Sequence, residues 1–261
     1  MSAHGPCRPL SAVAVLLLCG CSGSLPPLRG QIEVGRDAYA VFVAGGAPAG
    51  GDLYAVRAEG GAALPITFTN VGEMRPRLSP DGVSVVFLRG RSLTDSTPTT
   101  IWVMNLETGG EHELRLPKGS ALPTAAAWAD RGRTIVVSSG GGGTIYRFDA
   151  PPASSDARLV STTERPAAES SLAVLLGDPV FARVVPCIEP GALCIQPDTG
   201  APALLVRGAR DALAWGTDSV AYFVGDEVEI RPVGSGRIRR LDMDAPPRPR
   251  QMTAFMGSPK P

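Results

Sequence analysis

The sequence is poor in the residues that catalytic and metal sites need. Only two histidines occur in 261 residues, His4 and His112, and His4 falls in a leader-like N-terminus. The one remaining histidine cannot build a histidine-rich zinc site or a metal-dependent lactonase centre. A serine hydrolase would place His112 beside an activated serine, yet no G-x-S-x-G sequence occurs. We therefore predict that the protein is not an enzyme and has no metal site and no cofactor.

An excess of charge of one sign is also missing, because 25 Lys and Arg face 25 Asp and Glu. Such a chain has no overall field to attract nucleic acid, anionic lipid or acidic substrates. Long helical periodicity is absent, and so is any bilayer-length apolar run after residue 30. Glycine (31) and proline (25) are abundant instead, which is typical of many short strands joined by turns. These features predict an all-β protein with no nucleic-acid partner.

Residues 1–20 are predicted to be a signal peptide. Arg8 precedes the apolar stretch LSAVAVLLL, which is too short to span a membrane. The sequence LCGC at 18–21 resembles the bacterial lipobox, which predicts lipid attachment at Cys21. The alternative, cleavage by an ordinary signal peptidase, needs small residues at −3 and −1, and no clear A-x-A pattern is present. Residues 21–30 are small, polar and proline-bearing, as expected of a tether.

The leader also predicts where the protein resides. Lipid on Cys21 makes it a secreted protein anchored in the bacterial cell envelope. Ser22 rather than aspartate follows that cysteine. By resemblance to the enterobacterial sorting rule, this predicts the outer membrane, facing the periplasm, if the cell has one.

A strand–turn–strand phrase recurs along the chain. It reads RPRLSPDGVSVVFLRG at 75–90, AAAWADRGRTIVVSSG at 125–140 and DALAWGTDSVAYFVG at 211–225. Third strands are expected at 52–57, 100–105, 144–149, 192–197 and 227–232. Fourth strands are expected at 64–69, 111–117, 157–162, 203–208 and 237–242. Four strands in about 35–48 residues, repeated five times, is the period of a β-propeller blade.

The apolar pattern agrees with stacked blades. The second strands at 83–87 and 134–137 are apolar almost throughout, as expected when both faces of a sheet are covered. Aromatic residues recur at one position of three third strands: Tyr54, Trp102 and Tyr146. Because their spacing follows the repeat, we interpret them as packing between blades rather than as a platform for a ligand.

At this level of detail the chain resembles a known family. Ser79-Pro80-Asp81-Gly82, the VVF at 85–87 and the IWVMNLETGG at 101–110 are similar to the blade repeat of the TolB-like (WD-like) bacterial propellers. The resemblance covers about residues 31–243 and omits the separate N-terminal domain that TolB carries. It implies a β-propeller of four-stranded blades.

The number of blades and the closure of the ring are read from the strands. The countable blades favour five over the six with which the family commonly closes. The first blade has a short inner-strand candidate at 31–34, and 250–256, in the C-terminal tail 244–261, is expected to pair there and close the ring.

The function predicted from these features is a non-catalytic scaffold that binds an unknown envelope protein. The alternative is a propeller that binds a small molecule or ion, or acts catalytically, in its central channel. Arg75 and Arg77 lie on one side of an inner strand near that channel. They either hold an anionic ligand or form local pairs at a solvated channel mouth.

A loop at 89–99 is the longest connection between a second and a third strand. Such loops and the connections between blades emerge on the same side of a propeller, and variable loops on a rigid scaffold are the usual geometry of recognition sites. Arg89, Arg91 and Asp95 would supply polar contacts to a partner, and Leu93 an apolar anchor.

Two further cysteines, Cys187 and Cys194, flank a Pro190-Gly191 turn. Pairing Glu189 with Ala192 would place the cysteines opposite each other, within disulfide range, and export to an oxidising compartment favours the bond. The alternative is two buried free thiols. Asp211, Asp218 and Asp226 match no calcium-loop spacing, so we interpret them as aspartates of solvated turns.

Overall fold

The computed structural model describes residues 28–45, 50–93, 95, 97–140, 143–150, 158–164, 184–187, 189, 192–195, 201, 203–216, 218–232, 236–246 and 248–257. The predicted signal peptide 1–20, the lipidation site Cys21 and the tether up to residue 27 lie outside these residues. Among the described residues, no helix has the length and apolar character needed to cross a membrane.

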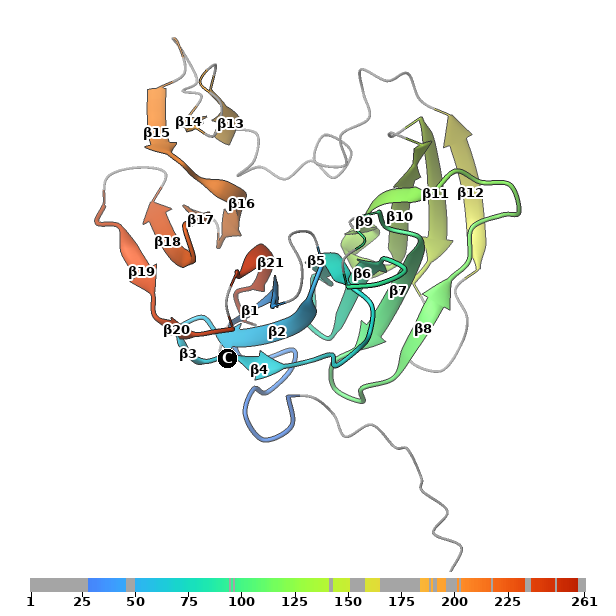
Figure 1. Ribbon diagram of the computed structural model, residues 1–261, viewed down its shortest axis with the longest axis horizontal. Helices are drawn as coiled ribbons and strands as arrows, with labels where there is room; N and C mark the ends of the chain where they lie inside the picture. The colour runs from blue at the N-terminus through green and yellow to red at the C-terminus, as the bar shows by residue number, and fades with distance from the viewer. Residues whose placement is uncertain are drawn as a thin grey trace, which may run out of the picture.

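Almost all regular structure in these residues is antiparallel sheet (Figure 1). The first sheet has the order β21-β1-β2-β4, and the second the order β5-β6-β7-β8. The strands of the first are β21 (Arg250–Phe255), β1 (Tyr39–Ala44), β2 (Asp52–Arg57) and β4 (Leu64–Pro65). Those of the second are β5 (Glu73–Leu78), β6 (Ser84–Arg89), β7 (Thr100–Asn105) and β8 (Glu111–Leu114).

Three more sheets continue the series along the chain. The third contains β9 (Pro123–Ala129), β10 (Thr134–Ser139), β11 (Thr144–Asp149) and β12 (Leu159–Glu164), with the short 3₁₀ turn η1 (Asp130–Gly132) after β9. The fourth contains β13 (Val184–Pro186), β14 (Ala192–Ile195) and β15 (Ala203–Arg207). The fifth contains β16 (Arg210–Trp215), β17 (Ser219–Val224), β18 (Glu227–Pro232) and β19 (Arg239–Leu241).

The sheets stand side by side around a centre, as the blades of a β-propeller do (Figure 1). The strand β21 contacts β5 on one side and β16 on the other, and β5 in turn contacts β9. The inner strands of four consecutive sheets are therefore neighbours. Apolar clusters fill the spaces between sheets, for example Val86, Ile101 and Ile135 between the second and third. The arrangement is a β-propeller, as predicted, and five blades stay a prediction.

The first sheet combines the two ends of the described chain. β21 pairs antiparallel with β1 and supplies the inner strand of this sheet. The expected inner strand at 31–34 is wrong, because these residues form turns in which Gln31 and Ile32 donate to the Leu28 carbonyl. Leu28 and Ile32 instead place buried side chains against the core between the first two sheets. A short parallel pair, β3 (Gly61–Ala62) with β20 (Met243–Asp244), joins the first sheet to the fifth.

Expected strands agree best where the repeat is strongest. The third strands 52–57, 100–105, 144–149 and 227–232 have the predicted bounds. The fourth strands are mostly shorter, and 64–69 reduces to Leu64–Pro65. There the chain leaves the ladder because the Thr67 hydroxyl accepts the Leu53 backbone N–H, and the Thr69 N–H donates to Asp52.

Candidate binding face

Backbone bulges shape the innermost part of the propeller. The strand pairings β5–β6, β16–β17 and β1–β21 each shift register at one point. Arg75, Asp211 and Gln251 lie at these points and have left-handed backbone angles of φ 55°, 51° and 52°. Residues other than glycine pay an energetic cost there, so the surroundings must hold them in place.

Side chains at these bulges link one sheet to the next. The Gln251 backbone N–H donates to Asp211 Oδ2 at 3.0 Å, and the Arg75 backbone N–H donates to Gln251 Oε1 at 2.7 Å. The Arg75 guanidinium then donates to the Thr124 carbonyl of β9. This chain of contacts, which we call the bulge ring, ties the fifth, first, second and third sheets together. The sequence carried no sign of Asp211 and Gln251 in this role, because the bulge is an irregularity of pairing.

Arg75 and Arg77 lie on the inner strand β5 and are exposed, as expected for a channel. Desolvation by the surrounding protein lowers the pKa of Arg77, and the charge of Arg75 lowers it further. The charge of Asp211 in β16 raises this pKa. Arg75 is engaged with Thr124, which agrees with the local-pairing alternative for this residue.

An arginine-rich pocket of about 280 Å³ opens between the fifth and first sheets. Its lining residues, here called the arginine pocket, are Arg210, Asp226, Arg248 and Arg250. Arg250 is buried and donates to the carbonyls of Arg248, Gly45 and Gly50. Burial lowers the pKa of Arg250, and Arg248 and Arg210 lower it further, while Asp211 opposes them. The pocket is therefore a region of positive potential.

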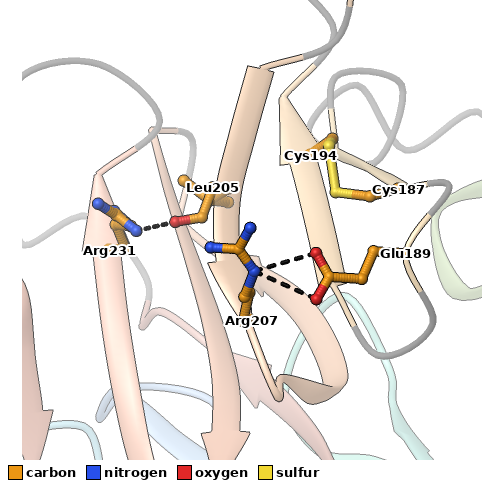
Figure 2. The surroundings of a disulfide bond; sticks show 6 residues. All are labelled: Cys187, Glu189, Cys194, Leu205, Arg207 and Arg231. Carbon is orange, nitrogen blue, oxygen red and sulfur yellow. Dashed lines mark hydrogen bonds and ion pairs between the residues drawn. A yellow bond between two sulfur atoms is a disulfide. The ribbon is translucent and has the colours of Figure 1, made fainter.

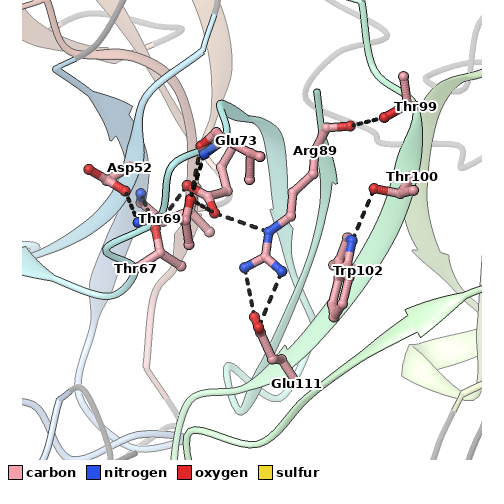
Figure 3. A network of polar contacts seen from close by, with 11 residues as sticks. Asp52, Thr67, Thr69, Glu73, Arg89, Thr99, Thr100, Trp102 and Glu111 are labelled. Atoms are coloured by element: carbon pink, nitrogen blue, oxygen red, sulfur yellow. Dashed lines mark hydrogen bonds and ion pairs between the residues drawn. The ribbon is translucent and has the colours of Figure 1, made fainter. Parts of the chain in front are cut away.

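The expected contact residue Arg89 is not part of a surface loop. It is the last residue of β6 and is buried, with 7% of its surface exposed. Its Nε lies 3.1 Å from Glu73 Oε1 and its Nη2 lies 2.8 Å from Glu111 Oε2 (Figure 3). The prediction that Arg89 contacts a partner is wrong, because its guanidinium already joins two carboxylates inside the second sheet.

Aromatic rings and hydroxyls complete this buried network. The Arg89 guanidinium carbon lies 4.4 Å from the Trp102 ring centroid and 5.1 Å from that of Phe87. Glu73 is fully buried and accepts hydrogen bonds from the hydroxyls of Thr67 and Thr69. Burial raises the pKa of Glu73, although Thr69, Arg89 and Thr67 all act in the opposite direction.

The other residues predicted to contact a partner differ in exposure. Arg91 is exposed, while Leu93 and Asp95 are partly buried. The Ser92 carbonyl accepts the N–H groups of Gly72 and Asp95, so the loop is tied to the connection that leads into β5. The Thr97 backbone N–H, which donates to Asp95 at 2.8 Å, is the main cause of the lowered pKa of Asp95. Asp95 shapes the loop and is less available to a partner than the sequence implied.

A large exposed aromatic residue lies at the same end of the sheets. Phe68 follows β4 and has 85% of its surface exposed. It lies between Thr67 and Thr69, which form hydrogen bonds with the beginning of β2. Thr69 also donates a hydrogen bond to Glu73. Leu122, 45% exposed, precedes β9. Because the strands are antiparallel, these blade connections share one face with the 89–99 loop and the arginine pocket. We call it the loop face.

Cys187 and Cys194 form a disulfide with a Cα–Cα distance of 5.2 Å (Figure 2). The Ala192 N–H donates to the Glu189 carbonyl, as expected across the turn. The predicted register is wrong, however, because Cys194 lies opposite Val185 and the Cys187 N–H donates to Ala192. The disulfide is thus diagonal. Beside it, Arg207 Nε lies 3.0 Å from Glu189 Oε2, which adds an exposed ion pair.

Metal-ligating side chains do not gather in the described part of the chain. No three residues among His, Cys, Asp and Glu there are arranged to hold a metal ion. His112 lies in β8, opposite Val103 of the neighbouring strand. Asp218 accepts the Ser219 hydroxyl, whereas Asp226 accepts the Arg248 backbone N–H.

No family model and no curated protein matches the chain. Among solved structures, a chain of a nidogen/laminin complex is similar, with 10% identity, a TM-score of 0.48, and coverage of 85% of this chain and 100% of that one. TolB from Acinetobacter baumannii has 20% identity and a TM-score of 0.35, and the alignment covers 78% of this chain and 51% of TolB. The periplasmic gluconolactonase PpgL of Pseudomonas aeruginosa has 13% identity and a TM-score of 0.36, with 82% and 69% covered. The chain thus spans about half the length of TolB, and these likenesses assign no function.

Proposed function

We propose that the protein is a non-catalytic scaffold that is anchored in the cell envelope by lipid on Cys21 and binds a protein partner with its loop face. The observation that carries this proposal is the exposure of Phe68 and Arg91 at one end of the rigid sheets. Aromatic and arginine side chains are the residues that most often supply the binding energy of protein interfaces. Hydrogen bonds hold the segments on both sides of Phe68, so little order is lost when a partner binds.

One other function is favoured by a specific observation. A propeller that binds a small molecule in its channel would use the arginine pocket at the channel mouth. The pocket measures about 280 Å³, slightly below the 300–1,000 Å³ that is usual for ligand sites. A pocket of this size is large enough for a small anion or for a single chemical group of a larger partner.

The proposal is tested by capturing partners from the native envelope with two matched double variants. One, Phe68→Ala with Arg91→Glu, changes the loop face. The control, Ile238→Ala with Arg237→Glu, makes the same kinds of change at exposed residues of the connection between β18 and β19, at the opposite end of the strands. We expect the first variant to lose a partner that the wild type and the control both recover.

Two outcomes would contradict the proposal. One is the recovery of identical partners by both variants. The other is a wild-type protein that enriches no envelope protein over empty beads. Thermal unfolding of each variant ensures that lost binding is not lost folding, and mass spectrometry of the purified protein checks for a diacylated Cys21 as the mature N-terminus.

A further inference from the structure

We propose that the arginine pocket binds a carboxylate group, presented by an acidic segment of the partner that docks on the loop face. This inference rests on the proposed function, since it names the chemistry of the partner. The pocket is separate in the fold from Phe68 and Arg91, and it is formed by β16, β21, the segment before β21 and the turn between β17 and β18.

The charge of the pocket favours an anion. Three arginines and one aspartate line it, so the lining residues carry a formal charge of +2. Asp211, in the neighbouring bulge ring, reduces the positive potential without lining the pocket. Guanidinium groups suit carboxylates because their planar N–H donors match both oxygens at once.

The guanidinium groups are held in position before any ligand arrives. Arg210 donates to the Gly225 carbonyl and lies over the Phe223 ring, with its guanidinium carbon 5.7 Å from the ring centroid. Arg250 is fixed by three backbone carbonyls. A prepositioned donor loses little side-chain entropy on binding, which increases affinity for a given set of contacts.

The backbone around the pocket is also strained. Arg248 has φ 60°, a left-handed conformation that costs energy for any residue with a Cβ atom. Its backbone N–H bonds to Asp226 Oδ2 at 3.4 Å, which connects this residue to the turn on the other side of the pocket. Strain of this kind gathers at ligand sites, where the surrounding structure can maintain it.

The size of the pocket suits a small anionic group such as a carboxylate. A volume of about 280 Å³ accepts an acidic side chain or a chain terminus. Asp226 is at the pocket wall and repels any anion, so it weakens but does not cancel the attraction of the three arginines.

The test measures binding of a fluorescent tetraglutamate peptide, with tetraglutamine as a carboxylate-free control, and both peptides are amidated at the C-terminus. Arg210→Gln with Arg248→Gln removes two of the three charges, and Arg248→Gln alone serves if the double variant unfolds. The matched control is Arg237→Gln, an exposed arginine outside the pocket. We expect the double variant to bind tetraglutamate at least about tenfold more weakly, and the control to bind like the wild type.

Asp226→Asn gives a readout in the opposite direction. It removes the repulsive charge and keeps an oxygen for the Arg248 N–H, so tetraglutamate should bind severalfold more tightly. Acetate should displace the peptide, because it carries the same chemical group. The proposal is overturned by equal binding to the wild type and the double variant, by an unchanged or weaker Asp226→Asn, by equal binding of tetraglutamine, or by a failure of acetate to displace the peptide.

Partner capture separates this inference from the proposed function. If Phe68→Ala with Arg91→Glu loses the partner but tetraglutamate does not bind, the loop face stands and the carboxylate site fails. The opposite outcome is an arginine double variant that loses tetraglutamate binding and still captures the partner. In that case the pocket binds a free carboxylate, and the proposal that it takes part in the partner interface is wrong.

Discussion

The second and fourth sheets of this propeller are stabilised in different ways. In the second, four consecutive residues of β6, Val85 to Leu88, are completely buried, and Glu73, Arg89 and Glu111 are joined inside the sheet. In the fourth, the side chains that the structure describes as buried are Ala192, Cys194 and Leu205, and the sheet carries the disulfide and an exposed ion pair. Among the described residues, the second sheet therefore combines apolar packing with a buried ion-pair network, whereas the fourth sheet has a covalent bond.

The largest effect is expected in the second sheet. Phe87→Ala removes a fully buried ring from the core between the first two sheets and should lower the free energy of unfolding by about 3–5 kcal/mol. Leu204→Ala, in β15 of the fourth sheet and 49% exposed, should cost less than about 0.5 kcal/mol. Urea unfolding measures both, and similar losses would show that the two sheets do not differ as described.

Loss of the disulfide should have the next largest effect. Replacing Cys187 and Cys194 by serine frees a loop with a sequence separation of 7 and should cost about 2–3 kcal/mol. Hydrogen exchange should accelerate in β14 and β15 but much less in β6 and β7. Uniform acceleration, or stoichiometric labelling of both thiols in the unreduced denatured wild type, would contradict the contrast between the sheets.

The smallest effect is a change in pH dependence. Because burial raises the pKa of Glu73 above its ordinary 4.5, the folded state keeps this proton at pH values where the unfolded chain has lost it. Stability from this group is therefore complete below about pH 4.5 and falls as pH rises through the folded pKa. Relative to Glu73→Gln, the wild type should lose stability as pH rises from 4 to 7. Parallel pH curves for the two proteins, or a relative gain, would exclude this role of Glu73.

Repetition made much of the fold predictable from sequence. Third strands recur with an apolar residue at a fixed position, so the bounds of β2, β7, β11 and β18 could be read directly. Gln31–Val34 looked like a strand because its apolar residues alternate, yet i→i+3 and i→i+4 backbone bonds form turns there. The same turns place Leu28 and Ile32 in the core between the first two sheets.

The candidate site was less predictable than the fold. Arg89 looked like a loop residue because it precedes a glycine, and its burial depends on Glu73 and Glu111, 16 and 22 residues away. Asp211 and Gln251 meet only through the ring of sheets, so no local pattern marks them. The spacing of Cys187 and Cys194 was enough to predict the disulfide. The register of the two strands was not predictable, because it depends on the hydrogen bond from the Cys187 N–H to the Ala192 carbonyl.

The pairing of β1 with β21 constrains the order of synthesis and folding. The apolar strand β1 is made early, but its partner is added roughly 210 residues later, about 10–40 s at ordinary rates of translation. Until then β1 presents an open strand edge of the kind that recruits other chains. A chain that stops before β21 would therefore leave this edge open instead of forming a smaller propeller.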